Sequence, residues 1–284
     1  MRLFARGLIA LTPESVEQTK ARERLRAEVK DLPKMRHSGN GAWSRHRIRL
    51  RRDILTKDPR TFATWDVIAA TMLPPPYARF VRQELRFLQR QDWATWSHVM
   101  RSNWIFRANA IHQAYHLCRF QMEAGAKIRD FDFILEFGGG YGEMRRIVDQ
   151  LGFRGDYAIV DLPEQNALQR YYLGTLGDPA TAIVSTIGAV NAMIDSQPRG
   201  SRKLFVATWS LDETPLETRA VWTDLLSGFD AFLIAYQANF EGVDNEKFFA
   251  EFQKRCPHIY WITSAIPQLK RSFYTFGTAS AGWP

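Results

Sequence analysis

The stretch ILEFGGGYGEM at residues 134–144 decides the fold of this chain. An apolar run ends at Glu136, and the chain then turns into a helix through four glycines, Gly138, Gly139, Gly140 and Gly142. Glycine permits such a turn and a close ligand approach, because it has no Cβ. A loop that binds ATP or GTP would need Lys and then Ser or Thr after the last glycine, where Glu143 and Met144 stand. The dinucleotide motif G-x-G-x-x-G would need glycine at position 143, so NAD is disfavoured as well.

Carboxylates near this turn favour a ligand with a positively charged end. A pyrophosphate at the start of the helix would lie close to Glu136, and like charges so near each other repel strongly. S-adenosylmethionine avoids this repulsion, because it presents an ammonium group and a sulfonium cation. Asp161 ends the next strand, where it either accepts hydrogen bonds from ribose hydroxyls or caps the helix expected at 163–176. We therefore expect S-adenosylmethionine as the cofactor, with Tyr141 and Leu162 completing this part of its site.

Seven β-rich runs follow Lys127 and alternate with amphipathic segments. The runs are FDFILEF, YAIVDL, TAIVST, KLFVATW, FDAFLIAY, HIYWITS and SFYTFG, and the helical segments lie at residues 141–151, 163–176, 188–196 and 215–226. Strict alternation indicates a parallel sheet covered on both faces, while the short link at 267–271 makes the last pair a hairpin. We expect an α/β, Rossmann-like, seven-stranded and mostly parallel sheet, with six parallel strands and one antiparallel edge strand, as in class I methyltransferases.

The chain before the sheet is helical in texture. Helices are expected at residues 14–29, 45–55 and 74–96, with a glycine loop at 38–44. We expect two regions. Residues 1–118 form an N-terminal helical, basic region that serves as a lid over cofactor and substrate, and residues 119–284 form the Rossmann-like methyltransferase domain.

The positive charge belongs to the N-terminal segment. Residues 1–60 hold 16 of the 38 Lys and Arg but only 7 of the 30 Asp and Glu. This favours an anionic partner such as an acidic membrane surface or glycan, whereas the alternative is a solvated helix face with alternating signs between Glu17 and Lys30. Nucleic acid is disfavoured, because the basic excess stops near residue 60 and no aromatic RNA-reading motif accompanies it.

Cysteine usage and hydropathy indicate a cytoplasmic protein. Cys118 and Cys256 lie far apart without metal-ligand spacing, so neither a disulfide framework nor a structural zinc site is expected. No apolar stretch approaches the roughly 20 residues of a membrane helix, and no cleavage site follows the first residues. Contact with the inner membrane would be peripheral, through the basic N-terminus.

The sequence resembles a bacterial family of sugar O-methyltransferases over roughly residues 40–240. The resemblance is carried by ILEFGGGYGEM followed by YAIVDLPEQNALQRYYL, and by the preceding segments ANAIHQAYHLCRF and DPRTFATW. It implies methyl transfer from S-adenosylmethionine to a sugar hydroxyl in polysaccharide or glycoconjugate assembly. Two alternatives stay open: another small-molecule hydroxyl or amine as the acceptor, or a non-catalytic Rossmann module that docks on an anionic partner.

Two histidines precede the first strand and are candidates for catalysis. An alcohol is a poor nucleophile, so a positioned base is expected, and histidine is the commonest one. His112 and His116 share a helix face by their spacing of four, with Tyr115 between them as a packing, lid or substrate residue. A metal site is not expected, because Gln113 stands where the zinc protease motif has glutamate.

Further candidates follow the fourth and fifth strands, at the edge where open α/β sheets bind ligands. In ATWSLDETP we expect Trp209 and Ser210 at the cofactor and Glu213 in catalysis, with Asp212 as a helix cap. The family pattern of Ser followed three residues later by Glu supports Ser210 and Glu213. After the fifth strand, the amides of Gln237 and Asn239 are suited to sugar hydroxyls, since an amide both donates and accepts.

Overall fold

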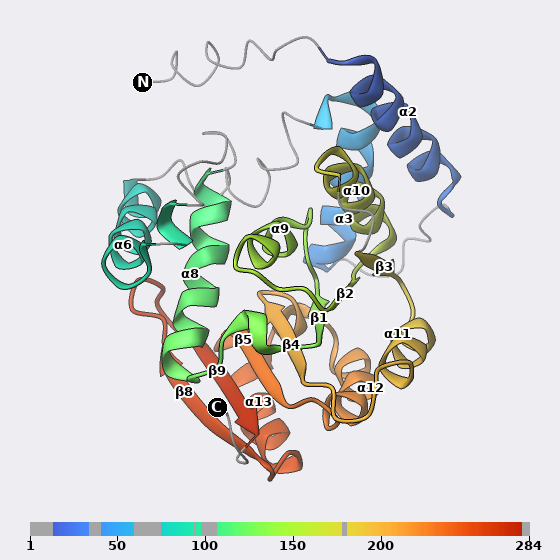
Figure 1. The fold of residues 1–284 in the computed structure, drawn as a ribbon. Helices are drawn as coiled ribbons and strands as arrows, with labels where there is room; N and C mark the ends of the chain where they lie inside the picture. The colour runs from blue at the N-terminus through green and yellow to red at the C-terminus, as the bar shows by residue number, and fades with distance from the viewer. Residues whose placement is uncertain are drawn as a thin grey trace.

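The computed structural model describes residues 14–33, 41–59, 75–93, 95–97, 107–177 and 181–279 (Figure 1). Expectations for residues 1–13, part of the glycine loop and most of DPRTFATW lie outside these ranges. All seven predicted strands form one sheet, in the order β3-β2-β1-β4-β5-β9-β8. Their bounds are β1 (Phe133–Phe137), β2 (Asp156–Val160), β3 (Ala182–Val184), β4 (Lys203–Thr208), β5 (Ala231–Gln237), β8 (Ile259–Ala265) and β9 (Ser272–Ala279).

The first five strands run in parallel, and their order reverses at β1. Strands β2 and β3 lie on one side of β1, whereas β4 and β5 lie on the other. The crossovers that leave β1 and β4 therefore diverge, and the carboxyl ends of strands at such a reversal are where open α/β sheets bind ligands. A separate short hairpin, β6 (Asn239–Phe240) with β7 (Val243–Asp244), follows β5.

The antiparallel strand is inside the sheet, which corrects the expectation of an antiparallel edge strand. β9 pairs antiparallel with both β5 and β8, so the edges are β3 and β8. The burial pattern gives the reason, because β9 is buried along nearly its whole length whereas β8 exposes Tyr260, Thr263 and Ala265. Gly277 permits the close pairing, since a Cβ there would lie 2.7 Å from side-chain atoms of Ile259 and Trp261.

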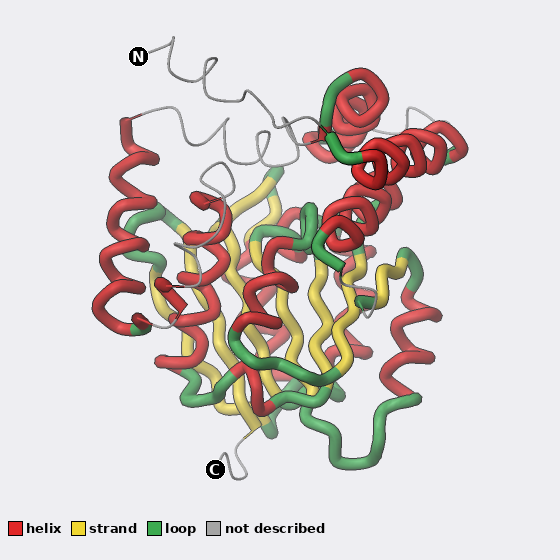
Figure 2. Tube along the Cα trace, turned by 45° about the horizontal axis from the view of Figure 1, so that its top comes forward, coloured by secondary structure: helices red, strands yellow, loops and turns green. Residues whose placement is uncertain are grey.

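Helices cover both faces of the sheet (Figure 2). Alternation along β1 sends Ile134 toward one face and Phe133 and Leu135 toward the other, and each set joins a separate buried core. The first core contains α8 and α9, and the second contains α11, α12 and α13. The bounds are α8 (Arg107–Glu123), α9 (Glu143–Gln150), α11 (Ile187–Asp195), α12 (Leu216–Leu226) and α13 (Asn245–Arg255).

The remaining helices attach the N-terminal region to the sheet at two places. Helices α2 (Val16–Asp31) and α3 (Ala42–Thr56) pack on α10 (Pro163–Thr175), with Leu25, Val29, Leu50 and Ile54 in their shared core. Helix α6 (Pro75–Gln91) packs on α8, on the other side of the molecule (Figure 1). Because α8 runs through residue 118, it joins the two expected regions, and their division there stays a prediction.

The described residues contain no helix that is both long and apolar enough to cross a membrane. Both cysteines are buried as free thiols. Helix α3 begins at Ala42, which lies within the glycine loop expected at residues 38–44 and before the expected helix start at residue 45.

Candidate active site at the carboxyl edge of the sheet

The glycine turn joins β1 to α9 and lies against β2 and β4. Gly138 and Gly140 have φ values of 76° and 59°, which favour glycine. A Cβ on Gly138 would lie 2.3 Å from the Cβ of Ser210, and one on Gly139 would lie 2.7 Å from Ile159. At Gly140, by contrast, a Cβ would meet no atom of the described residues within 4 Å. The turn is thus closed by protein on one side and open for a ligand at Gly140.

Glu136 places a carboxyl group on a buried face of the sheet that otherwise carries apolar side chains. It lies two residues after Ile134 on the same face of β1 and is only 3% exposed. The hydroxyl of Tyr157 on β2 donates a hydrogen bond of 2.8 Å to its Oε2. Burial raises the pKa of the Glu136 carboxyl to about 8. A cation beside it would restore the charged form.

Asp161 links the end of β2 to the glycine turn. Its Oδ2 accepts hydrogen bonds from the backbone N–H of Gly140 at 3.1 Å and from the side chain of Gln169 at 3.0 Å, while Oδ1 accepts from Leu162 at 2.7 Å. A carboxylate has about four acceptor positions, so one remains for a ligand. Burial raises the pKa of Asp161 to about 7. Within the described chain no side chain caps α10, whose N-cap is Leu162, so the helix-cap alternative for Asp161 is not seen.

Trp209 and Ser210 leave the end of β4 beside the glycine turn. The hydroxyl of Ser210 donates a short hydrogen bond to the carbonyl of Phe137, which ties the two strand ends together. Trp209 has a φ of 59°, a strained value for a bulky side chain, and its backbone N–H is fixed on the carbonyl of Ala235 at 3.0 Å. Strain of this kind persists where the surrounding structure enforces it, and here it directs the indole toward α8.

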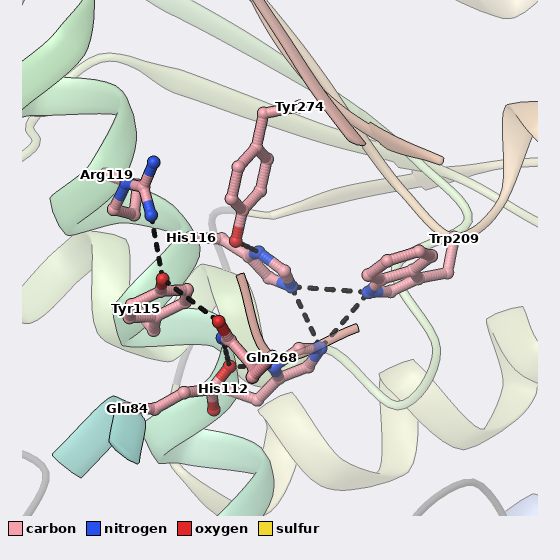
Figure 3. A network of polar contacts seen from close by, with 8 residues as sticks. All are labelled: Glu84, His112, Tyr115, His116, Arg119, Trp209, Gln268 and Tyr274. Atoms are coloured by element: carbon pink, nitrogen blue, oxygen red, sulfur yellow. Dashed lines mark hydrogen bonds and ion pairs between the residues drawn. The ribbon is translucent and has the colours of Figure 1, made fainter. Parts of the chain in front are cut away.

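The indole of Trp209 meets the two histidines of α8 (Figure 3). His112 Nε2 and His116 Nε2 lie 3.0 Å apart, and the indole N–H points at both, at 3.1 and 3.3 Å. The other ring nitrogens are held as well: His112 Nδ1 lies 2.9 Å from Glu84 Oε1, and His116 Nδ1 lies 2.5 Å from the hydroxyl of Tyr274. Burial, with His112 adjacent, holds the pKa of His116 well below its usual value.

The expected HxxxH face is therefore present, and its geometry does not suit a metal ion. An N–H donor is aimed at the place where a cation would have to bind the two Nε2 atoms. Moreover, no group of three or more His, Cys, Asp or Glu side chains in the described ranges is placed to bind one.

Glu213 and Gln237 also meet at this edge, beyond β4 and β5. Gln237 Nε2 donates to Glu213 Oε1 at 3.0 Å, and burial next to Asp212 raises the pKa of Glu213 to about 8. Asp212 is buried and accepts from the backbone of Gln237 at 2.9 Å, so it holds the end of β5. It does not cap α12, whose N-cap is Pro215. Asn239 is exposed on β6.

Two further expected site residues are buried at the margins. Tyr141 accepts a hydrogen bond of 2.9 Å from Asn109 of α8, which links the glycine turn to the helix of the histidines. The ring of Tyr115 packs against Phe87 of α6, with 5.0 Å between the ring centroids, and its hydroxyl contacts Gln268 at 3.4 Å. Its role in substrate binding stays a prediction.

Sequence reasoning missed several residues that hold the site. Glu84, Gln268 and Tyr274 contact the histidine network or its neighbours from α6, the β8–β9 link and β9. None belongs to a local motif, because each is more than 25 residues from its partner. A signal was present only for Tyr157, which by alternation along β2 shares a face with Glu136.

The strand order identifies the fold. Five parallel strands that reverse at β1, followed by a hairpin whose reversed strand lies next to β5, form the sheet of class I methyltransferases. The expected Rossmann-like fold class is confirmed.

The similar proteins named below are solved structures with low sequence identity to this chain. No family model and no curated protein matches it. Among solved structures, it is similar to mitomycin 7-O-methyltransferase MmcR, at 11% identity over 93% of this chain and 95% of that one, with a TM-score of 0.40. It is also similar to a fibrillarin pre-rRNA processing protein from Methanococcus jannaschii, at 12% identity over 55% of this chain and 69% of that one, with a TM-score of 0.40. A SAM-dependent methyltransferase from Aquifex aeolicus matches at 10% identity over 56% and 88%, with a TM-score of 0.39.

Proposed function

We propose that this protein is an S-adenosylmethionine-dependent O-methyltransferase that transfers a methyl group to a sugar hydroxyl of a polysaccharide or glycoconjugate. One observation carries the proposal: two carboxyl groups, the buried Glu136 and the half-buried Asp161, flank a glycine turn that is open at Gly140. Their pKa values are raised to about 8 and about 7. Such a site favours a cationic ligand and disfavours a pyrophosphate.

The residues present fit the cofactor. Glu136 would hold its positively charged end, Asp161 its ribose hydroxyls, and the backbone at Gly140 would approach it without obstruction. When bound, the cofactor supplies an electrophilic methyl group on sulfur. Because Trp209 follows β4 beside the glycine turn and contacts His112, the acceptor would approach from the side of α8 and its histidines.

The chain offers two groups that could take the hydroxyl proton. His112 lies beside Trp209 at the end of β4, and Glu213 lies beyond the same strand. Burial raises the pKa of Glu213 to about 8, so only the minor, ionised fraction of Glu213 can accept a proton at neutral pH. We therefore assign the base role to His112, with Gln237 as an acceptor contact.

The sugar acceptor rests on the sequence resemblance and on polar side chains at the edge. Glu213 and Gln237 together present acceptors and donors, which suit hydroxyl groups. The alternatives are distinguished by an acceptor screen, in which methylation of other small hydroxyls or amines, but not of sugars, would revise the acceptor. Cofactor binding without turnover on any acceptor would support a non-catalytic module.

Cofactor identity is tested by calorimetry. S-adenosylmethionine and S-adenosylhomocysteine should bind, and NAD should give no heat. Asp161→Ala should weaken cofactor binding by about 1–3 kcal/mol, because charge-assisted hydrogen bonds are lost. Asp53→Asn, which changes a buried carboxylate on α3, is the control and should leave affinity unchanged. Tight NAD binding by the wild type would contradict the proposal.

A further inference from the structure

Four side chains from three elements form a hydrogen-bonded chain behind Trp209. It runs from Tyr274 on β9 through His116 and His112 on α8 to Glu84 on α6 (Figure 3). We propose that Glu84 is a positioning residue that fixes His112 as the tautomer protonated on Nδ1, so that its Nε2 is the basic atom facing the end of β4. The catalytic consequence rests on the proposed function, whereas the tautomer does not.

The Tyr274 end of the chain sets the direction of its hydrogen bonds. Within the described residues the buried Tyr274 hydroxyl has one hydrogen-bond partner, His116 Nδ1 at 2.5 Å, and a buried O–H has to donate. His116 therefore accepts at Nδ1. Since its lowered pKa keeps it neutral, its proton lies on Nε2. That N–H can only donate to His112 Nε2, 3.0 Å away, which must then carry a lone pair.

The Glu84 end gives the same direction independently. Arg119 donates to the Tyr115 hydroxyl at 2.8 Å, which leaves the hydroxyl hydrogen for Gln268 Oε1 at 3.4 Å. This contact orients the amide, so that Gln268 Nε2 donates to Glu84 Oε1 at 3.0 Å. An ionised Glu84 has acceptor oxygens only, so the nitrogen that faces its Oε1, Nδ1 of His112 at 2.9 Å, bears hydrogen, in agreement with the Tyr274 end.

The indole supplies a third, consistent observation. The Trp209 N–H is a donor only, and its shorter contact, 3.1 Å, is to His112 Nε2, the nitrogen to which both ends of the chain assign the lone pair. An acceptor hydroxyl that replaces one of these donors would find a base already oriented. When Nε2 takes the hydroxyl proton, the imidazolium keeps its Nδ1–H on Glu84, which is fully buried and therefore interacts strongly with the new charge.

Two measurements test the proposal: ¹⁵N chemical shifts report the tautomer, and kinetics report its catalytic consequence. In ¹⁵N-histidine-labelled wild-type protein, imidazole ¹⁵N shifts should show His112 protonated on Nδ1 and His116 on Nε2, with assignments from single histidine variants. Glu84→Gln keeps the shape of the side chain but removes the charge. In the otherwise wild-type protein it should lower kcat at least about 10-fold, move the acidic limb of the kcat profile to lower pH, and leave cofactor affinity unchanged. Combined with Tyr274→Phe, which removes the donor that holds the tautomer from the other end, it should populate the other His112 tautomer.

Asp53→Asn serves as the matched control, because it neutralises another buried carboxylate, on α3 and outside this network. It should alter neither the tautomer nor the pH profile. A wild-type His112 protonated on Nε2 would overturn the proposal without any variant. A Glu84→Gln protein with unchanged kcat and pH profile would overturn it as well, as would a Tyr274→Phe, Glu84→Gln protein with an unchanged His112 tautomer. Absence of methyl transfer in the wild type would refute the proposed function alone, because the ¹⁵N shifts still decide the tautomer.

Discussion

At the scale of single residues, Glu136 couples folding to the ligand. A carboxyl whose pKa is raised on folding prefers the protonated form in the folded chain, so its burial is least unfavourable at low pH. Between its ordinary pKa of 4.5 and the folded value of about 8, the unfolded state ionises and the folded state does not. The free energy of unfolding therefore falls as pH rises through this window.

We expect the ligand-free protein to lose stability between pH 4.5 and about pH 8, and Glu136→Gln to lose less. Each pKa unit corresponds to about 1.4 kcal/mol, so the two proteins should diverge by a few kcal/mol across the window. Urea unfolding at several pH values measures the difference. Adding S-adenosylmethionine should flatten the wild-type curve, because a bound cation favours the ionised carboxylate. Parallel pH curves for the two proteins would show that Glu136 is not buried in the protonated form.

The assignment of the base can also be decided residue by residue. His112→Ala should lower turnover by at least about 10²-fold with little change in cofactor affinity, because the loss falls on the transition state. Glu213→Gln keeps the hydrogen-bonded shape at Gln237 and should remain active. If Glu213 were the base, the wild-type rate would instead rise up to about pH 8, the pKa of Glu213, and Glu213→Gln would lose activity.

The site illustrates which residues a sequence can disclose. Glu136 and Asp161 were predictable because each ends a recognisable strand beside a glycine turn. Glu84 and Tyr274 were not, because only the folded chain brings α6 and β9 to the histidines. The burial of Asp212 was hidden too, since a polar residue before a helix is ordinarily read as a cap.

At the scale of elements, different glycines of the turn serve packing and ligand access. Gly138→Ala should destabilise the fold strongly, because its Cβ would overlap Ser210 and its φ is positive. Gly140→Ala meets open space, so it should lower stability by only about 1 kcal/mol for its positive φ, yet impair cofactor binding. Urea unfolding and calorimetry on both variants measure the contrast.

Gly152→Ala is the control for the backbone effect alone, since it has a φ of 87°, open space and a position at the far end of α9. It should match Gly140→Ala in stability and bind the cofactor normally. Equal cofactor affinity for Gly140→Ala and Gly152→Ala would contradict a ligand site at Gly140.

Element order was predicted more fully than element position in the sheet. Alternating apolar runs and amphipathic segments indicated all seven strands and the first four crossover helices. The placement of β9 inside the sheet depends on the crossover through α13, which brings β8 one strand width beyond β5 and leaves a gap for β9. Pairing over that distance leaves only indirect traces in the sequence, such as Gly277 opposite Trp261.

At the scale of the whole molecule, several arginines of the basic N-terminal segment bind other parts of the protein rather than an outside partner. Arg26 of α2 donates to the carbonyls of Ile54 and Lys57 at the end of α3, and Arg51 of α3 donates to those of Leu32 and Pro33 after α2. The two helices thus satisfy each other's terminal carbonyls. Arg47 forms a two-point ion pair with the buried Glu164 at the start of α10.

This arrangement changes how the anionic-partner hypothesis has to be tested. Deleting residues 1–36 would remove α2 with its Leu25 and Val29 and expose Leu50 and Ile54 of α3, so lost binding could result from unfolding. Single substitutions separate the two uses of charge. Arg51→Gln should lower the free energy of unfolding by about 1 kcal/mol, because it leaves helix-end carbonyls without a charged donor, and should not alter association with vesicles rich in acidic lipid.

Lys20→Gln is the matched control, since Lys20 is an exposed cation on α2. It should leave stability unchanged, because an exposed charge contributes little to folding. Vesicle co-sedimentation over a range of salt concentrations measures the association of both variants. Salt-sensitive binding that falls with Lys20→Gln would support an anionic surface as the partner. If Arg51→Gln left stability unchanged but abolished vesicle binding, the structural role of Arg51 would be contradicted. Arg51 would then be part of a surface that binds acidic lipid.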